Sequence, residues 1–185
     1  MKKVSLFGIL LFLISGVFAQ TPHAEFGLKA GLNLSKFNQP NYDNIAGFNA
    51  GAFAHVHLSE HFALQPEVVY SQQGSKLPNN ETQRVNYINI PVLGQYMFAG
   101  GLRLQTGPQI GLRTSATIKN GDHESDNNNS YTNADVAWSF GVGFLSPIGL
   151  GVDARYNLGL TDITKNAYDI KNRVFQVGLF YQFKK

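Results

Sequence analysis

The sequence predicts an all-β fold in which eight antiparallel strands close into an up-and-down barrel. Apolar residues recur at every second position, which is the period of a strand with two different faces. Short and long connections alternate between these segments, as they do in a meander of hairpins. The segments cover residues 26–35, 47–58, 64–71, 88–98, 102–113, 136–144, 150–159 and 175–183. At about ten residues each, they are long enough to cross a bilayer at a tilt.

Each segment places its apolar residues on one face. In the first four segments this face consists of Phe26, Leu28, Ala30, Leu32 and Leu34, then Phe48, Ala50, Ala52, Ala54, Val56 and Leu58, then Leu64, Pro66, Val68 and Tyr70, then Ile88, Ile90, Val92, Tyr96 and Phe98. In the last four it consists of Leu102, Leu104, Thr106, Pro108, Ile110 and Leu112, then Val136, Trp138, Phe140, Val142 and Phe144, then Leu150, Val152, Ala154, Tyr156 and Leu158, then Phe175, Val177, Leu179, Tyr181 and Phe183. The opposite face is mainly polar or glycine, so each strand separates two different environments.

The connections predict which ends of the strands lie together. Tight turns are expected at 59–61, 99–101 and 146–149, and long polar loops at 38–46, 74–84, 115–134 and 161–172. An up-and-down order places all the long loops at one end. Outer-membrane barrels have this asymmetry, with short periplasmic turns and long external loops. An even number of strands then leaves both termini on the periplasmic side.

The first 19 residues have the features of a secretory signal peptide. Two lysines precede an apolar stretch that ends at Phe18, and Ala19 fits a signal-peptidase site before Gln20. An N-terminal membrane anchor is the alternative, but the apolar run is short for a span. We therefore expect a signal peptide at 1–19 and one barrel domain at 20–185.

Composition excludes several classes of protein. The chain has a formal net charge of +3, and removing the two leader lysines lowers it to +1. A nucleic-acid partner is therefore not expected, since such proteins cluster many basic residues. The absence of cysteine excludes disulfides and thiolate metal sites. After residue 20 no apolar run is long enough for a membrane helix, which leaves a membrane barrel open.

Two kinds of exported barrel have this period. In a soluble, lipocalin-like barrel the apolar face lines a ligand cavity, whereas in a membrane barrel it meets lipid. The polar face here is rich in glycine, which suits the narrow interior of eight strands, and it carries both signs of charge. Aromatic residues lie near strand ends on the apolar face, as in interfacial girdles. These features favour the membrane. Val142→Arg, on the lipid side, should then destabilise by roughly 2–4 kcal/mol, and Gly141→Ser by less.

Two further expectations concern the interior and the strand pairing. Side chains can fill an eight-stranded barrel, so no wide pore is expected. Pro66, Pro91 and Pro108 lie within strand patterns and lack a ladder donor, and they therefore predict bulges or local irregularity.

Several strand motifs are similar to those of the PorT-like family of small outer-membrane β-barrels. The most specific is Tyr-Ile-Asn-Ile-Pro-Val-Leu at 87–93. More modest matches lie at 64–67, 107–108, 153–156 and 177–183. The resemblance covers most of the chain after the leader and implies an outer-membrane barrel. It implies little about activity, because fold does not fix function.

Five charged residues of the polar face form the main candidate site. They are Glu67, Arg103, Arg113, Asp153 and Arg155. A catalytic or transport set is one interpretation. The favoured one is a structural network of lumenal ion pairs, because isolated charges there would cost several kcal/mol.

Two weaker candidates concern metals. His55 and His57 share a strand face, and His61 follows the turn, but no carboxylate at a fitting spacing completes a metal site. Asp122, Glu124 and 126–129 suggest calcium, yet the EF-hand pattern fails and a solvated loop is favoured. No cofactor or metal is expected.

The leading functional hypothesis is a non-enzymatic outer-membrane barrel of a Gram-negative envelope, with a filled lumen and four external loops. Its role would be structural, adhesive or accessory to an envelope or secretion complex. Its partners would be outer-membrane lipid, the barrel assembly machinery during biogenesis and other envelope proteins. The alternatives are a soluble periplasmic carrier of an apolar ligand and a lipid-modifying outer-membrane enzyme, although the sequence contains no hydrolase, phosphate-loop or zinc-protease motif.

Overall fold

The computed structural model describes residues 24–79, 81–120, 123–126, 131–164 and 169–183. The expected signal peptide at 1–19 lies outside these ranges. Within them the structure has no helix long and apolar enough to cross a membrane. The strands are β1 Ala24–Phe37, β2 Ile45–His57, β3 Phe62–Lys76, β4 Thr82–Met97, β5 Leu102–Asn120, β6 His123–Asp126, β7 Ala134–Leu145, β8 Leu150–Gly159 and β9 Asn172–Phe183.

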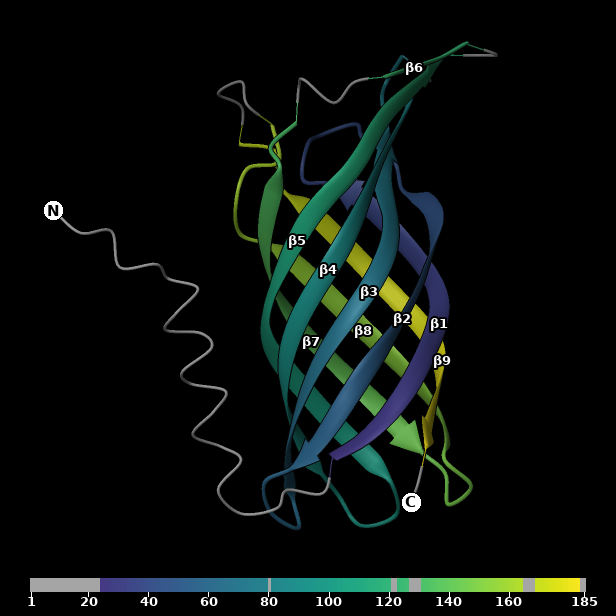
Figure 1. Ribbon diagram of the computed structural model, residues 1–185. Coiled ribbons are helices and arrows are strands. Elements are labelled where there is room, and N and C mark those ends of the chain that lie inside the picture. Colours follow the sequence, from purple (N-terminus) through teal and green to yellow (C-terminus); the bar gives the residue numbers. More distant parts are fainter. Residues whose placement is uncertain (1–23, 80, 121–122, 127–130, 165–168, 184–185) are drawn as a thin grey trace, which may run out of the picture.

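Eight of these strands close a barrel (Figure 1). Each pairs antiparallel with its neighbours along the chain, and β1 pairs with β9 from Phe26 opposite Phe183 to Phe37 opposite Asn172. The short strand β6 pairs only with the far end of β5. The predicted eight-stranded up-and-down barrel is thus confirmed.

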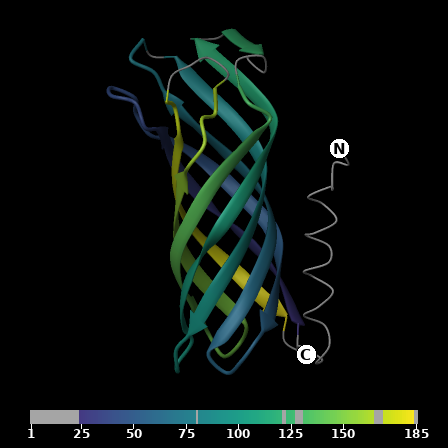
Figure 2. The same cartoon turned by 90° about the vertical axis from the view of Figure 1, so that its left-hand side faces the viewer.

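The two ends of the barrel differ (Figures 1 and 2). Tight turns join β2 to β3, β4 to β5 and β7 to β8 at the end where β9 finishes, as predicted. Gly100, Gly101 and Gly149 in these turns have φ between 88° and 96°, a region that suits glycine. We call this the short-turn end and the opposite one the long-loop end.

Several strands are longer at the long-loop end than the sequence predicts. β3 continues to Lys76 and β4 begins at Thr82, so the loop expected at 74–84 shrinks to 77–81. β5 runs to Asn120, and β6 folds back on it in register, so the solvated loop expected at 115–134 is partly a hairpin.

These differences arise because the two faces exchange polarity along a strand. In β1, Leu34 points outward and is exposed, whereas Phe37 points inward and is 1% exposed. In β4, Ile90 is exposed outward, but Val85 and Tyr87, nearer the strand's start, are buried inside. The prediction assumed that apolar residues point outward along the whole strand. It therefore ended each strand at the position where apolar residues begin to point inward.

Of the bulges or local irregularity expected at the three prolines, the structure shows local irregularity, in the form of gaps in the strand pairing, and no bulge. Pro66 pairs with β4 but not with β2, Pro91 with β5 but not with β3, and Pro108 with β7 but not with β4. The register is the same on both sides of each gap. A proline lacks only one donor, so each loses its pairing with one neighbour and keeps the other. The bulge lies instead at Asn86/Tyr87, opposite Thr114, whose hydroxyl donates to the Asn86 carbonyl at 3.1 Å.

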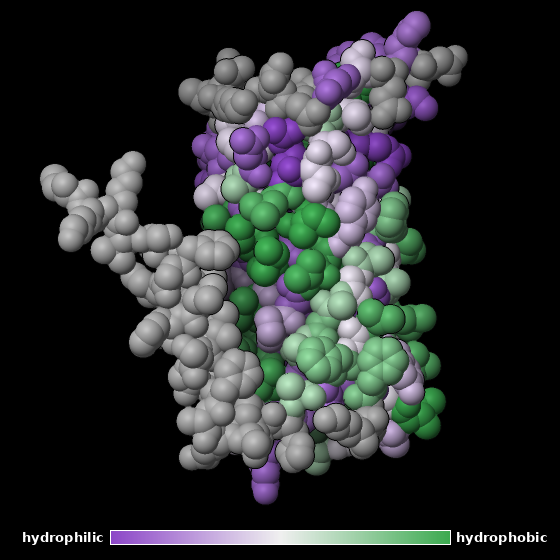
Figure 3. Space-filling view, viewed as in Figure 1, coloured by the Kyte–Doolittle hydropathy of each residue, from purple (hydrophilic) through white to green (hydrophobic). Residues whose placement is uncertain are grey.

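The apolar strand faces point outward along the wall of the barrel. Leu32 is 70% exposed and Leu179 57%, whereas Asn33 and Gln182 are almost fully buried. Figure 3 shows apolar residues over the middle of the barrel and hydrophilic ones gathered at the long-loop end. This arrangement confirms the lipid-facing assignment and contradicts the alternative of a soluble barrel with an apolar ligand cavity.

Candidate functional site

Four charged side chains meet near the middle of the lumen. Both terminal nitrogens of Arg155 on β8 donate to the Glu67 carboxylate on β3, each at 2.8 Å. Lys29 Nζ on β1 lies 2.9 Å from Asp153 Oδ2. The two pairs are joined, since Lys29 lies 3.5 Å from Glu67 and Arg155 lies 3.5 Å from Asp153. We call these four residues the charge layer.

The charge layer is electrically balanced and almost dry. Its side chains are 0–10% exposed, and two cations face two carboxylates. Removing charges from water costs several kcal/mol each, so close pairing and further hydrogen bonds are needed to offset the loss. Gln65 donates to Glu67 at 2.8 Å, and Arg155 also donates to Gln105 at 3.2 Å. Residues of β1, β3, β5 and β8 are thereby tied across the barrel.

The structure brings three of the five predicted site residues together. Glu67, Asp153 and Arg155 belong to the charge layer. Arg103 lies nearer the short-turn end, where it donates to Gln182 Oε1 at 2.9 Å. Arg113 lies at the opposite mouth and donates to the Thr132 carbonyl and the Asn133 side chain. Lys29 completes the charge layer but was not among the predicted site residues. The only signal in the sequence was that Lys29 lies on the lumenal face of its strand.

The histidine candidates lie between the charge layer and the short turns. His55 is buried, and its Nδ1 lies 3.2 Å from Gln65 Oε1. Its ring meets that of His57 edge-on, with centroids 4.6 Å apart, while His61 stacks on Tyr96. Among the described residues no three His, Cys, Asp or Glu side chains are grouped to hold a metal.

The calcium candidate is only partly described. Asp122 and 127–129 lie outside the described residues. Glu124 and Asp126 belong to β6, paired opposite Lys119 and Thr117 of β5. The backbone here is a regular antiparallel ladder, which differs from the tight loop of an EF-hand site.

An amide layer lies above the charge layer. The Asn33 side-chain nitrogen donates to Ser71 Oγ at 2.9 Å, and its oxygen accepts from Asn49 and Gln176. Gln73 continues the layer by donating to Ser71. These side chains satisfy one another's hydrogen bonds, as buried polar groups need to do.

Little free space remains beside the charge layer. A cavity beside the charge layer, bounded by Lys29, Phe53 and Arg103 among others, holds about 10 Å³, the room that one water needs. The Phe53 and Phe180 rings meet edge-on there, 5.9 Å apart. The same rings fill the space a side chain would occupy at Gly27 and Gly151, which explains glycine at those two positions.

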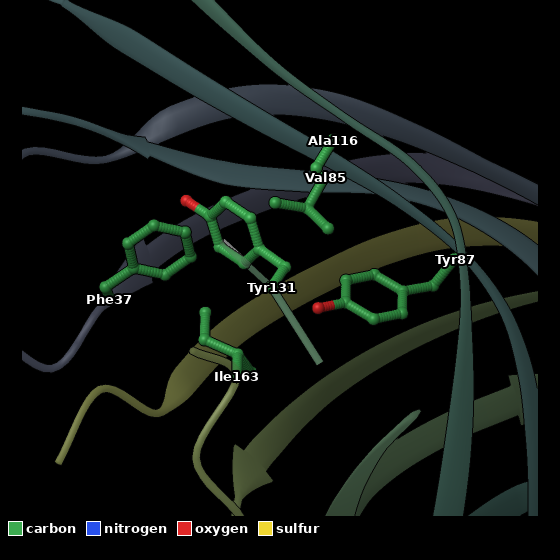
Figure 4. Packing of buried hydrophobic residues seen from close by; sticks show 6 residues of the cluster. All are labelled: Phe37, Val85, Tyr87, Ala116, Tyr131 and Ile163. Carbon is green, nitrogen blue, oxygen red and sulfur yellow. The ribbon is translucent and has the colours of Figure 1, made fainter. Parts of the chain in front are cut away.

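The long-loop end is filled differently, by an apolar cluster that we call the cap. Figure 4 shows its buried side chains converging from several elements. They are Phe37, Val85, Tyr87, Ala116, Tyr131 and Ile163, with Tyr42 and Ile170 packed against them. Tyr131 also donates to Gln83, and the Thr132 nitrogen donates to the Ile163 carbonyl at 2.8 Å. The cap joins three of the long connections to the barrel wall. Sequence analysis missed it, because these residues lie beyond the segments with the expected pattern.

Comparison with known proteins identifies the family of this barrel. A model of the family described as Outer membrane protein beta-barrel domain matches residues 18–165. The chain belongs to this family. It is an outer-membrane β-barrel protein, located in the cell outer membrane, as the sequence predicts.

Solved structures share the fold of this outer membrane beta-barrel domain at low identity. Neisserial surface protein A is 16% identical, with 86% of this chain and 99% of that chain covered and a TM-score of 0.64. Ail, the attachment invasion locus protein of Yersinia pestis, is 15% identical, with the same coverage and a TM-score of 0.55. No curated protein matches the sequence.

The chemistry available to this outer membrane beta-barrel domain follows from its interior. The charge layer holds its carboxylates in ion pairs, and little space remains beside it for a substrate. Among the described residues no hydrogen bond joins a serine hydroxyl to a histidine ring, so the pairing that activates a serine nucleophile is not seen there. The arrangement suits a closed scaffold.

Proposed function

We propose that this protein is a non-conducting, non-enzymatic barrel that presents its long-loop end as a binding surface. The observation that carries the proposal is the cap. Tyr42, Tyr131 and Ile163 come from three different connections and pack with the strand ends into one buried cluster. Loops rooted in a common core keep a defined shape, which a binding surface requires.

The filled lumen supports the non-conducting part of the proposal. The charge layer, the amide layer and the cap follow one another along the barrel, and the cavity beside the charge layer holds about one water. We propose that Glu67, Asp153 and Arg155 serve a structural purpose together with Lys29. Planar-bilayer recordings of the wild type should show no steady conductance, and open channels of defined size would contradict the proposal.

An adhesive role is the form of this function that the comparisons favour. Ail is described as an attachment invasion protein and was solved with the heparin analogue sucrose octasulfate. We propose by analogy that the surface of this chain binds a component outside the cell, and the analogy rests on fold alone.

Surface display tests the adhesive role. Cells displaying the wild type should adhere to immobilised host matrix or polysulfated glycan more than cells displaying a variant whose segment 121–130, which includes β6, is replaced by a short Gly-Ser linker. A second variant with the Ser59-Glu60 turn replaced is the matched control, since it alters the other end. Equal adhesion by cells displaying any of the three proteins would contradict the adhesive role.

An accessory role in an envelope complex is the second candidate. The motif at 87–93 is similar to PorT-like barrels, and we propose that the chain groups with them within its wider family. A pull-down from detergent-solubilised envelopes should then recover a stoichiometric partner. Recovery of lipid and barrel assembly machinery alone would count against this role.

The absence of enzymatic activity is also a proposal. A lipid-modifying enzyme needs a catalytic cluster on the outer wall, and the described residues offer no serine–histidine pair. Lipid A mass spectra should therefore be unchanged when the gene is deleted, and a new or lost species would overturn this part of the proposal.

A further inference from the structure

Two cations face each other on the outer wall where the apolar surface ends. Lys36 of β1 lies directly opposite Arg173 of β9 in the ladder. Residues in such positions have Cβ atoms about 5 Å apart, and like charges directly opposite each other are destabilising. Among the described residues neither cation forms an ion pair with a carboxylate. The fold therefore places two like charges opposite each other on neighbouring strands, and no carboxylate of the described residues is paired with either.

The pair is held by regular backbone structure. Below it, Leu34 lies opposite Phe175, and both are exposed on the outer wall. Above it, the backbone pairing continues, because the Asn38 nitrogen donates to the Lys171 carbonyl at 3.0 Å. The backbone positions of Lys36 and Arg173 are thus fixed relative to each other and to the apolar surface.

A neighbouring cation shows the contrast. Lys171 Nζ lies 2.8 Å from Asp169 Oδ1, and this hydrogen bond lowers the pKa of the Asp169 carboxyl. Asp169, which lies just before β9, is therefore paired with Lys171. Lys36 and Arg173 remain available to an anion from outside the chain.

We propose that Lys36 and Arg173 form a binding site for the phosphate of an anionic lipid headgroup in the membrane leaflet at the long-loop end. A phosphate between the two cations would replace their repulsion with two charge-assisted contacts, and the planar Arg173 guanidinium can grip two phosphate oxygens. The acyl chains of the same lipid would lie along Leu34 and Phe175. The position of the pair, directly above a lipid-facing surface, favours a lipid over a dissolved anion.

The test uses the full mature chain folded in vesicles. Unfolding by urea is followed through the fluorescence of Trp138, the one tryptophan of the chain. The wild type and the double variant Lys36→Gln, Arg173→Gln are compared in pure phosphatidylcholine and in equal parts of phosphatidylcholine and phosphatidylglycerol. The wild type should gain stability with phosphatidylglycerol. In the variant this gain, expressed as a ratio of unfolding constants, should fall by more than the roughly thirtyfold that the general attraction of an anionic surface for two cations accounts for.

The sign of the effect in neutral lipid is equally informative. In pure phosphatidylcholine the double variant should be as stable as the wild type or more so, because the repulsion is relieved. A large loss there would show that the cations are structural and would overturn the proposal.

The matched control removes the same charge elsewhere. Lys76 and Lys119 lie on either side of Thr82 in the ladder, one strand apart, so they do not face each other. Lys76→Gln with Lys119→Gln should reduce the gain much less. An equal reduction would mean that only the general surface potential acts, and the site would be rejected.

Two further measurements separate the remaining outcomes. Millimolar inorganic phosphate added to phosphatidylcholine vesicles should not reproduce the gain, and if it does, the site takes a free anion instead of a lipid. If the double variant does not fold, native mass spectrometry of Arg173→Gln and Arg173→Lys provides the test. Retained phosphatidylglycerol should fall with Gln and largely persist with Lys, and equal retention by wild type and Gln would reject the site.

Discussion

The middle of the barrel and its long-loop end are built in opposite ways. In the middle, Leu32 faces outward while Asn33 and the charge layer lie inside. At the long-loop end, Lys36 faces outward while Phe37 and the rest of the cap lie inside. The same strand passes from one arrangement to the other within four residues. The side that is polar is therefore set by what surrounds the wall, hydrocarbon in the middle and water above it.

The two regions should also lose stability through different kinds of substitution. In the middle, stability depends on pairing, because a polar group without a partner inside a lipid-enclosed lumen is costly. In the cap, stability depends on apolar burial and packing, as in a soluble protein. Four substitutions test this contrast, from the largest expected effect to the smallest.

Arg155→Met removes one partner from the charge layer. Glu67 would keep the hydrogen bond from Gln65 and one cation, Lys29 at 3.5 Å, and breaking a buried pair in this way costs about 3–5 kcal/mol of unfolding free energy. The measurement is urea unfolding in lipid vesicles. Arg103→Met is the control, since Arg103 donates to a neutral amide, and it should cost about 1–2 kcal/mol. Equal losses would mean that charge pairing is not what distinguishes the middle of the lumen.

Val142→Arg places a charge on the lipid side of β7. It should cost about 2–4 kcal/mol near the bilayer centre. Gly141→Ser is not the mild companion expected from the sequence, because a Cβ at Gly141 would lie 2.8 Å from the Ala154 carbonyl oxygen. Gly143→Ala is the better control, since the nearest atom there is 3.4 Å away. Folding yield and urea unfolding in vesicles measure both, and equal costs would contradict the lipid-facing assignment.

Ile163→Ala opens space in the cap. Ile163 is fully buried, and its loss should cost about 2 kcal/mol, the lower end of the range for such a change because a loop can settle into part of the gap. The cost should appear as faster amide exchange at the long-loop end, with the middle of the barrel unchanged. Uniformly faster exchange throughout the barrel would show that the two regions unfold as one unit.

Thr106→Val tests a polar contact on the outer wall itself. Trp138 Nε1 donates to Thr106 Oγ1 at 2.9 Å, at a place that faces lipid. Thr106 Oγ1 also donates to the Ser139 carbonyl at 3.0 Å, so the substitution removes two hydrogen bonds and should cost about 1–2 kcal/mol of unfolding free energy. The unfolding free energies of Thr106→Val, Trp138→Phe and the double variant are measured by urea unfolding in vesicles, followed by circular dichroism. Additive costs would show that the two side chains do not interact.

The sequence was sufficient to predict the barrel but not its full height. Alternation with period two identifies which residues share a face, and the tight turns fix the hairpin order. The exchange of faces beyond Leu34 and before Ile88 hid the outer parts of the strands and the cap with them. A search for the reversed pattern, polar out and apolar in, would have found Phe37, Val85 and Tyr87.

The charge layer shows a second kind of limit. The lumenal face of Glu67 and Arg155 follows from alternation, but their meeting across the barrel depends on the stagger of β3 against β8. The distance between two residues of the same strand, in contrast, could be read from the sequence. Arg103 and Arg113 are ten residues apart on β5, which is about 33 Å along a strand, so one compact network could not contain both.

The pairing of β1 with β9 has a consequence for biogenesis. The first strand made by the ribosome finds one of its two neighbours only in the last, from Asn172 to Phe183. A chain released before this point would expose two open edges, and each unsatisfied backbone group costs several kcal/mol in hydrocarbon. Closure of the wall therefore depends on β9, and a chain truncated before Asn172 should not form a stable barrel in the bilayer.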